Sequence, residues 1–334
     1  MRGKVSELSG GSRVGINEFT VIEMEETTPT NTEKGATPVL NVYADQNFLI
    51  YCTKNPTWQR KIKEAYNFGA ITIVLSPWHF YECGMGAAHA DADELLNFTE
   101  DLQPKWIIER ADLQLFEFWV AWNQVWNSSK DIVEPIGTFA EIAAILTKVD
   151  ERHLRDVKMR DYVNAFSKHD ALAAVKKALE NHRNISDTVR DEYLRRRSDK
   201  TTWQEMELRH LAVQLARLEL RTKGTNQVWD RANSLVYEQP IRTQMEFFIS
   251  SGFTRELKCH ATEAAFTEEL FTSGGGLDTR RFVDRQHASV ALPYCDRFIT
   301  DDGELRKRCA RIIGWLPFQS AAVMTAEEFL RTLP

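Results

Sequence analysis

The sequence lacks the features that mark membrane, secreted and zinc-binding proteins. No apolar run reaches the roughly 18 residues that a membrane span needs, and the first residues contain no apolar core of a signal peptide. The five cysteines are scattered, odd in number and form no Cys-x-x-Cys pair, which argues against both a disulfide framework and a structural zinc site. We therefore expect a cytoplasmic protein that does not associate with membranes.

There is also no excess of positive charge. The formal net charge of the 334 residues is -6, which excludes a protein that holds nucleic acid by its overall charge, so any contact with a polyanion must be local. What the sequence does contain is 43% hydrophobic residues. This is enough for a packed core in one large domain or two small ones.

Acidic residues follow the apolar segments that we predict to be β-strands. Because ligands of open α/β sheets bind outside the carboxyl ends of the strands, these acids are candidates for a common site. The acids are Asp45 after residues 39–44, Glu82 in the helix after residues 70–75, and Asp301 and Asp302 after residues 297–300.

A fourth acid, Asp284, lies in a segment that we predict to be helical over residues 278–292, where Pro293 would end the helix. Ala288 and Ala291 continue the stripe that Asp284 begins, and their small side chains allow close packing. We therefore expect Asp284 on a packed face of this helix.

This arrangement resembles the PIN-domain family of metal-dependent nucleases, and its small VapC-like members in particular. In that family a hydrophobic strand is followed by an aspartate, as at Asp45. A helix that carries an aspartate then precedes a strand that closes on Thr-x-Asp, as at Asp284, Thr300 and Asp302. The runs FITDDGEL and VMTAEEFL resemble the closing strands and helices of the family. Asn47 follows Asp45 as part of Gln-Asn, where the family usually has Thr-Asn.

The resemblance implies an α/β fold with a PIN-like three-layer α/β/α architecture around a central parallel sheet. The nuclease domain would comprise residues 39–111 and 246–334, interrupted by an all-helical insertion of residues 112–245. Residues 1–38 would form a polar N-terminal lead-in. We predict no strand in residues 112–242.

The resemblance also implies the chemistry. Carboxylates that lie close together repel one another and hold protons unless a cation neutralises them, and oxygen ligands favour Mg²⁺ or Mn²⁺ over zinc. We expect a metal-dependent endoribonuclease that hydrolyses RNA, of a toxin-like or phage-defence kind, with an antitoxin or regulatory protein as partner. The expected roles are metal ligation by Asp45, Asp284 and Asp302 or Asp301, ligation through water by Glu82, and orientation of ligands or water by Asn47 and Thr300.

The predicted insertion carries two apolar stripes at helical spacing. Leu115, Trp119, Trp122 and Trp126 form the first, which we interpret as a core seam in preference to a base-stacking platform. Four leucines between positions 208 and 218 form the second. That short seam predicts a helix pair inside the insertion or a contact in a homo-oligomer.

Polar residues of the insertion carry two further predictions. Thr202 and Glu205 form a capping box that predicts a helix start. Basic residues cluster from Arg183 through residues 195–197 to Arg217, with others nearby. They form either a local patch that grips a phosphate backbone or a solvated helix face, and the sequence leaves both interpretations open.

Two other functions fit parts of the sequence. A PIN-like fold can serve as a binding scaffold with idle acids, although all four acidic positions are retained here. A phosphatase of the haloacid dehalogenase type would use Asp45 as its nucleophile, but that family needs a second aspartate where Asn47 stands. We interpret His79, a lone histidine one turn before Glu82, as a packing or solvent-facing residue and not as a metal ligand.

Overall fold

The computed structural model describes residues 38–79, 82, 92–108, 110–127, 135–138, 140–141, 160–161, 200–220, 226–252, 257–273 and 279–333. Several predicted features lie outside these residues. They are the N-terminal lead-in up to residue 37, the helix cap at Asp278, and the basic residues from Arg183 to Arg197.

A mostly parallel β-sheet forms the centre of the fold, as the α/β class predicted from the sequence requires. In the described part of the chain the strand order is β4-β3-β2-β1-β5-β6, and only β4 runs antiparallel to its neighbour. The strands are β1 (Leu40–Ala44), β2 (Ile71–Leu75), β3 (Lys105–Ile107), β4 (Ile136–Gly137), β5 (Arg297–Ile299) and β6 (Ala322–Met324). The first described strand, β1, therefore lies in the middle of the sheet, and later strands extend the sheet in both directions.

The predicted absence of a strand in residues 112–242 is wrong, because β4 lies there. β4 pairs with β3 through Gly137 opposite Trp106 and Ile136 opposite Ile107. A strand of two residues has no alternating pattern of its own, so its conformation depends on the neighbouring strand that it pairs with.

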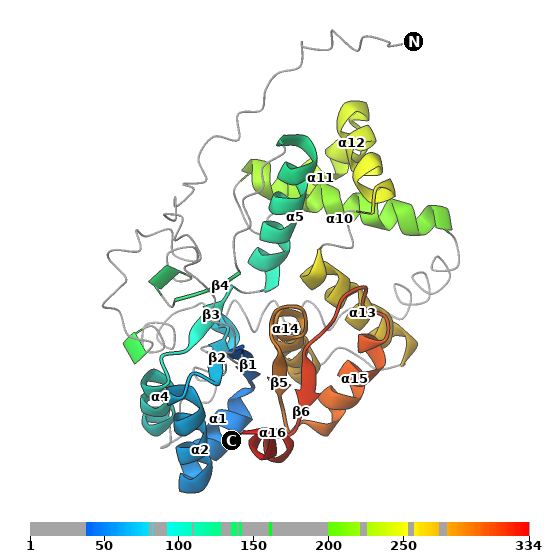
Figure 1. The fold of residues 1–334 in the computed structure, drawn as a ribbon. Coiled ribbons are helices and arrows are strands. Elements are labelled where there is room, and N and C mark those ends of the chain that lie inside the picture. Colours follow the sequence, from blue (N-terminus) through cyan, green and yellow to red (C-terminus); the bar gives the residue numbers. More distant parts are fainter. Residues whose placement is uncertain are drawn as a thin grey trace, which may run out of the picture.

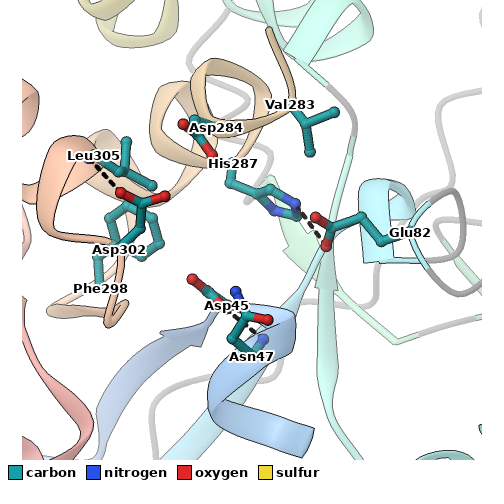
Figure 2. A pocket seen from close by; sticks show the side chains of 9 residues that line it. All are labelled: Asp45, Asn47, Glu82, Val283, Asp284, His287, Phe298, Asp302 and Leu305. Carbon is teal, nitrogen blue, oxygen red and sulfur yellow. Dashed lines mark hydrogen bonds and ion pairs between the residues drawn. The ribbon is translucent and has the colours of Figure 1, made fainter. Parts of the chain in front are cut away.

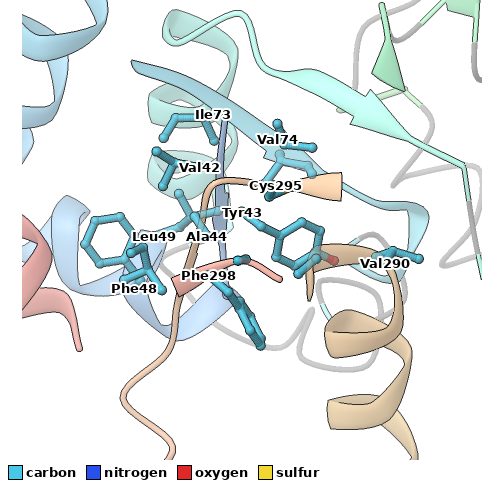
Figure 3. Close-up of a cluster of buried hydrophobic side chains, with 14 of the residues drawn as sticks. Val42, Tyr43, Ala44, Phe48, Leu49, Ile73, Val74, Val290, Cys295 and Phe298 are labelled. Atoms are coloured by element: carbon cyan, nitrogen blue, oxygen red, sulfur yellow. The ribbon is translucent and has the colours of Figure 1, made fainter. Parts of the chain in front are cut away.

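Strand β1 is buried on both faces. Val42, Tyr43 and Ala44 have no exposed surface, as expected for a central strand of a parallel sheet. Successive side chains point to opposite faces, so Tyr43 packs towards Val290 while Val42 lies on the side of Leu49 (Figure 3).

Helices cover the sheet on both sides (Figure 1). The helices that follow β1 and β2 gather on one side, and those that precede and follow β5 gather on the other, because right-handed connections reverse face when the direction of strand addition reverses. The first group is α1 (Gln46–Lys54), α2 (Pro56–Asn67) and α4 (Ala92–Asp101), and the second is α13 (Lys258–Thr272), α14 (Thr279–Tyr294) and α15 (Gly303–Ile313).

The last helix, α16 (Ala326–Thr332), follows β6 as the sequence predicts, and it packs against α2. Its start is fixed by a capping box, in which the Thr325 hydroxyl accepts the backbone N–H of Glu328 and the Glu328 carboxylate accepts the backbone N–H of Thr325.

Helix α14 does not end at Leu292 as predicted, but continues through Pro293 to Tyr294. Proline removes one backbone donor, but the hydrogen-bond ladder resumes beyond it, since the N–H of Cys295 donates to the carbonyl of Ala291 at 3.0 Å. Asp284 lies on the packed face of this helix, as expected, because Ala288 and Ala291, which continue its stripe, are fully buried.

A second hydrophobic cluster lies apart from the sheet. It is formed by α5 (Arg110–Asn127), α10 (Lys200–Leu220), α11 (Asn226–Tyr237) and α12 (Gln239–Ser250). Helix α5 belongs to both cores, because Leu113 packs in the sheet core and Phe118 in the helical cluster. The helical cluster continues to Leu257, and the sheet core resumes at Cys259.

The apolar stripes of the helical region are packed inside the chain. Trp119 and Trp122 lie against the second cluster, and the Trp122 ring contacts the Phe248 ring at 5.5 Å between centroids. This confirms a core seam for these two residues, while the side chain of Trp126 lies outside the described part. The leucine stripe, from Leu208 to Leu218, packs in the same cluster.

Two polar predictions in this region are wrong. Thr202 does not begin a helix, because α10 already starts at Lys200 and Thr202 lies inside it. Arg217 is not part of a surface patch, because it is buried and donates to the backbone carbonyl of Ala111 and to Gln214.

Within the described residues, none of the helices is both long and apolar enough to cross a membrane.

Candidate functional site

A pocket of about 460 Å³ opens at the carboxyl ends of β1 and β5. This is the point where the chain changes direction across the sheet, which is the usual place for a ligand in an open α/β fold. The pocket is lined by Asp45, Asn47, Glu82, Val283, Asp284, His287, Phe298, Asp302 and Leu305 (Figure 2). Four acids from four separate chain segments thus meet at one site, as the sequence predicts.

Asp45 is held rigidly at the end of β1. It caps α1, with its Oδ1 accepting the backbone N–H of Asn47 at 2.5 Å, and its Oδ2 accepts the hydroxyl of Thr300 at 2.6 Å. Burial raises the pKa of Asp45, the hydrogen bond from Thr300 opposes this, and the charge of Glu82 raises it further. Asp45 therefore holds a proton more readily than a solvated aspartate.

Glu82 faces His287 across the pocket, with 3.1 Å between its Oε2 and the histidine Nε2 (Figure 2). Burial favours protonation of Glu82, but the charge of His287 outweighs it and lowers the pKa of Glu82. Burial lowers the pKa of His287, but the acids around it, Glu82 first, raise it overall. The two residues therefore stabilise one another as an ion pair.

Asp284 is paired with a cation from the neighbouring helix. The Arg308 guanidinium of α15 lies 2.7 Å from Asp284 Oδ2, and both side chains are largely buried. Burial nevertheless raises the pKa of Asp284 to about 6, opposed by Arg308 and reinforced by the charge of Asp302. The carboxylates of the pocket therefore repel one another even though Arg308 neutralises one of them.

The structure separates the two adjacent aspartates that follow β5. Asp302 lines the pocket and caps α15, accepting the backbone N–H groups of Glu304 and Leu305 through Oδ1. Asp301 is exposed, is not among the lining residues, and accepts the N–H of Ala326 at the start of α16. Of the two alternatives left open by the sequence, the geometry places Asp302 at the site.

His79 has a packing role, as expected. It is fully enclosed, its Nε2 lies 2.8 Å from the backbone carbonyl of Ala44, and its Nδ1 lies 3.0 Å from the backbone N of Ser76. Burial lowers the pKa of His79 to about 4. It therefore fixes the two strand ends that lead to the pocket.

Sequence reasoning missed two residues of the site, His287 and Arg308. The signal for His287 was present, because it lies one helical turn after Asp284 and so shares its face of α14. Arg308 ends a run of three consecutive basic residues in α15, and nothing local marks it as the partner of an acid in another helix. From the sequence we expect only a bound cation to neutralise the four acids, but in the structure His287 and Arg308 already compensate part of their negative charge.

The lining of the pocket bears on whether it could hold a divalent cation. In the part of the chain that the structure describes, no group of three or more His, Cys, Asp or Glu side chains is arranged to hold a metal ion. The chemistry of the lining residues does fit Mg²⁺ or Mn²⁺, since most polar groups offer oxygen. The raised pKa values of Asp45 and Asp284 also indicate a pocket that a cation would stabilise.

Comparison of the chain with models of protein families, with curated proteins and with solved structures finds no match.

Proposed function

We propose that the protein is a metal-dependent nuclease with a PIN-like fold, which hydrolyses phosphodiester bonds of RNA. One observation carries the proposal: Asp45, Glu82, Asp284 and Asp302 come from four segments far apart in sequence and line one pocket. Structural roles alone, such as helix capping, give no reason for four acids to share a cavity at the carboxyl ends of the strands.

The architecture supports the same proposal. A mostly parallel sheet with helices on both sides agrees with the three-layer arrangement that the resemblance implies. The closing elements, β5 with Thr300 and Asp302 and then β6 with α16, follow in the expected order.

Each pocket residue has a distinct task in this proposal. Asp45, Asp284 and Asp302 would offer carboxylate oxygens to Mg²⁺ or Mn²⁺, and Glu82 would bind through a water molecule. Thr300 and the backbone of Asn47 hold the Asp45 carboxylate in place through the hydrogen bonds described above. A divalent ion, when bound, would polarise the phosphodiester and lower the pKa of an attacking water.

The adjacent pair Asp302 and Asp301 allows a closely matched test. Labelled RNA is incubated with Mn²⁺ and the wild type, Asp302→Asn or Asp301→Asn. Asparagine caps helices about as well as aspartate, and its amide oxygen can also accept the Ala326 N–H that Asp301 accepts, so neither variant should lose much stability. We expect Asp302→Asn to lower the cleavage rate by more than about 100-fold, because the loss of a residue that only supports a metal ligand already costs about 10- to 100-fold. We expect Asp301→Asn to cleave RNA at the wild-type rate.

Asp45→Asn and Asp284→Asn extend the test to the other segments, and excess chelator should stop the wild type. Circular dichroism and unfolding midpoints establish that each variant is folded. Equal cleavage by the wild type, Asp302→Asn and Asp45→Asn would refute the nuclease assignment.

A binding scaffold with idle acids is the second candidate. The observation that favours it is the pairing of Glu82 with His287 and of Asp284 with Arg308, which leaves these carboxylates engaged inside the protein. A wild type that binds RNA or a protein but neither binds Mn²⁺ nor cleaves RNA would establish this alternative.

A further inference from the structure

His287 stands at the centre of a chain of polar contacts that reaches beyond the four acids. Its Nε2 lies 3.1 Å from Glu82 Oε2, and its Nδ1 lies 2.6 Å from the hydroxyl of Tyr43. That hydroxyl lies 2.6 Å from the hydroxyl of Ser76. Four residues from β1, the end of β2, the segment after it and α14 are thus linked in one chain.

The positions of the hydrogens follow from Glu82. An ionised carboxylate has no hydrogen to donate, so the His287 Nε2 that faces it carries a hydrogen in both the neutral and the protonated ring. In the neutral ring Nδ1 is then an acceptor, so the Tyr43 hydroxyl donates to it and can accept from Ser76.

The His287 ring is also fixed in orientation by its neighbours. Its centroid lies 4.9 Å from that of His79 and 5.7 Å from that of Tyr43, in edge-to-face contact with both rings. The side chain is only 6% exposed. Rotation of the ring away from Glu82 would therefore break the hydrogen bond with Tyr43 and the ion pair with Glu82, and it would disturb two ring contacts.

We propose that His287 is a positioning residue that holds Glu82 in the pocket, with Tyr43 and Ser76 setting the nitrogen that faces it. His287 is not itself a metal ligand, because both ring nitrogens already face partners inside the protein. Its ion pair with Oε2 of Glu82 would hold the carboxylate and leave Oε1 available to an ion or to its water. The inference rests on the proposed metal-dependent function and adds the residues that orient its glutamate.

Mn²⁺ binding measured by calorimetry on the full chain tests the inference without relying on catalysis. Tyr43→Phe removes only the hydroxyl, and His287→Leu removes both ring nitrogens. We expect each to weaken Mn²⁺ binding by about 10- to 100-fold, the usual loss when a residue behind a metal ligand is removed. His287→Gln, whose amide N–H₂ can replace the Nε2 donor, should restore most of the affinity.

Tyr294→Phe is the matched control. It removes the hydroxyl of another tyrosine, at the end of α14, which donates to the carboxylate of Glu117; neither of these two residues lines the pocket. We expect it to lower stability without changing Mn²⁺ affinity. Weaker Mn²⁺ binding in Tyr294→Phe equal to that of Tyr43→Phe would show a general structural effect and overturn the inference.

Long-range ¹H–¹⁵N spectra of histidine-labelled protein supply an independent signature. The His287 signals are assigned by their loss in His287→Gln, and we expect a hydrogen on Nε2 in the wild type. A His287 that carries its only hydrogen on Nδ1 would overturn the inference. Wild-type Mn²⁺ affinity in both Tyr43→Phe and His287→Leu would also overturn it, but the proposed metal site would stand. Absence of Mn²⁺ binding by the wild type would overturn both the proposed function and this inference.

Discussion

At the scale of single residues, Glu117 is an acid kept in an unfavourable environment. It lies buried on α5 and accepts the backbone N–H groups of Cys259, at 2.7 Å, and His260, at 3.4 Å, together with the hydroxyl of Tyr294. Glu117 thus provides the N-terminal cap of α13, which has none of its own. Burial outweighs these hydrogen bonds and raises the pKa of Glu117 from 4.5 to about 7.

This shift predicts how stability depends on pH. Because the folded protein binds the Glu117 proton more tightly than the unfolded chain, this contribution to stability is present below pH 4.5 and is lost as the pH rises through about 7. We expect the free energy of unfolding of the wild type to fall relative to Glu117→Gln between pH 5 and 7, by at most about 1.4 kcal/mol per pH unit.

Urea unfolding at several pH values checks this prediction, with the exposed Glu94→Gln as control. Since Asp284 also has a raised pKa, the difference between variant and wild type is the informative quantity. If the free energy of unfolding changed in parallel with pH in the wild type and Glu117→Gln, the predicted role of Glu117 would be contradicted.

At the scale of elements, helix α14 connects the pocket to the rest of the fold. One face carries Asp284 and His287, and the other faces Glu263 of α13, which accepts hydrogen bonds from Arg285 and Ser289 of α14 and from Arg110 of α5. Burial favours protonation of Glu263, but the two arginines outweigh it and lower its pKa to about 2.

Removal of this carboxylate should therefore destabilise the protein strongly. Glu263→Gln leaves two arginines near a neutral amide, and breaking a buried ion pair typically costs about 3–5 kcal/mol. We expect a clear drop in the free energy of unfolding at neutral pH, measured with urea. The stabilisation is present above pH 4.5 and is lost as the pH falls through about 2, so the wild type and the variant should converge in acid.

The exposed ion pair of Lys307 and Glu304 is the matched control. Glu304→Gln should leave the unfolding midpoint almost unchanged, because water screens an exposed pair. A similar small effect of Glu263→Gln would show that the buried network does not stabilise α14.

The same elements show what the sequence can predict. Strands β1, β2 and β5 were placed to within one residue, because apolar runs that end at an acid or a Ser-Pro pair are strong local signals. Strand β4 and the end of α14 at Tyr294 were missed, since the first depends on pairing with β3 and the second on tolerance of Pro293 in a last turn.

The candidate site divides in the same way. The four acids could be predicted, because each follows a strand or shares a helix stripe with small residues. The partners of the acids could not, because the contact of Arg308 with Asp284 and of Tyr43 with His287 exists only after distant segments have packed together.

At the scale of the whole molecule, two hydrophobic cores share helix α5. Phe118 is fully buried in the helical cluster, where its ring contacts those of Trp122 and Phe248. Phe118→Ala should cost about 3–5 kcal/mol, the usual range for a large aromatic deletion in a core. Because the sheet core is a separate cluster, hydrogen exchange should increase in α10, α11 and α12 while β1 and β5 stay protected.

Phe48→Ala, in the sheet core, is the reciprocal variant, and it should increase exchange mainly in β1 and its neighbours. Exchange that rises uniformly over both clusters in either variant would mean that the two cores unfold as one cooperative unit.

The outer strands of the sheet have a further consequence. Within the described residues, one edge is the two-residue β4 and the other is the three-residue β6. Edge strands this short offer few free backbone groups to a strand from a second chain, which is one way in which proteins avoid fibril growth. The folded sheet should therefore be a poor template for amyloid, even in concentrated solution.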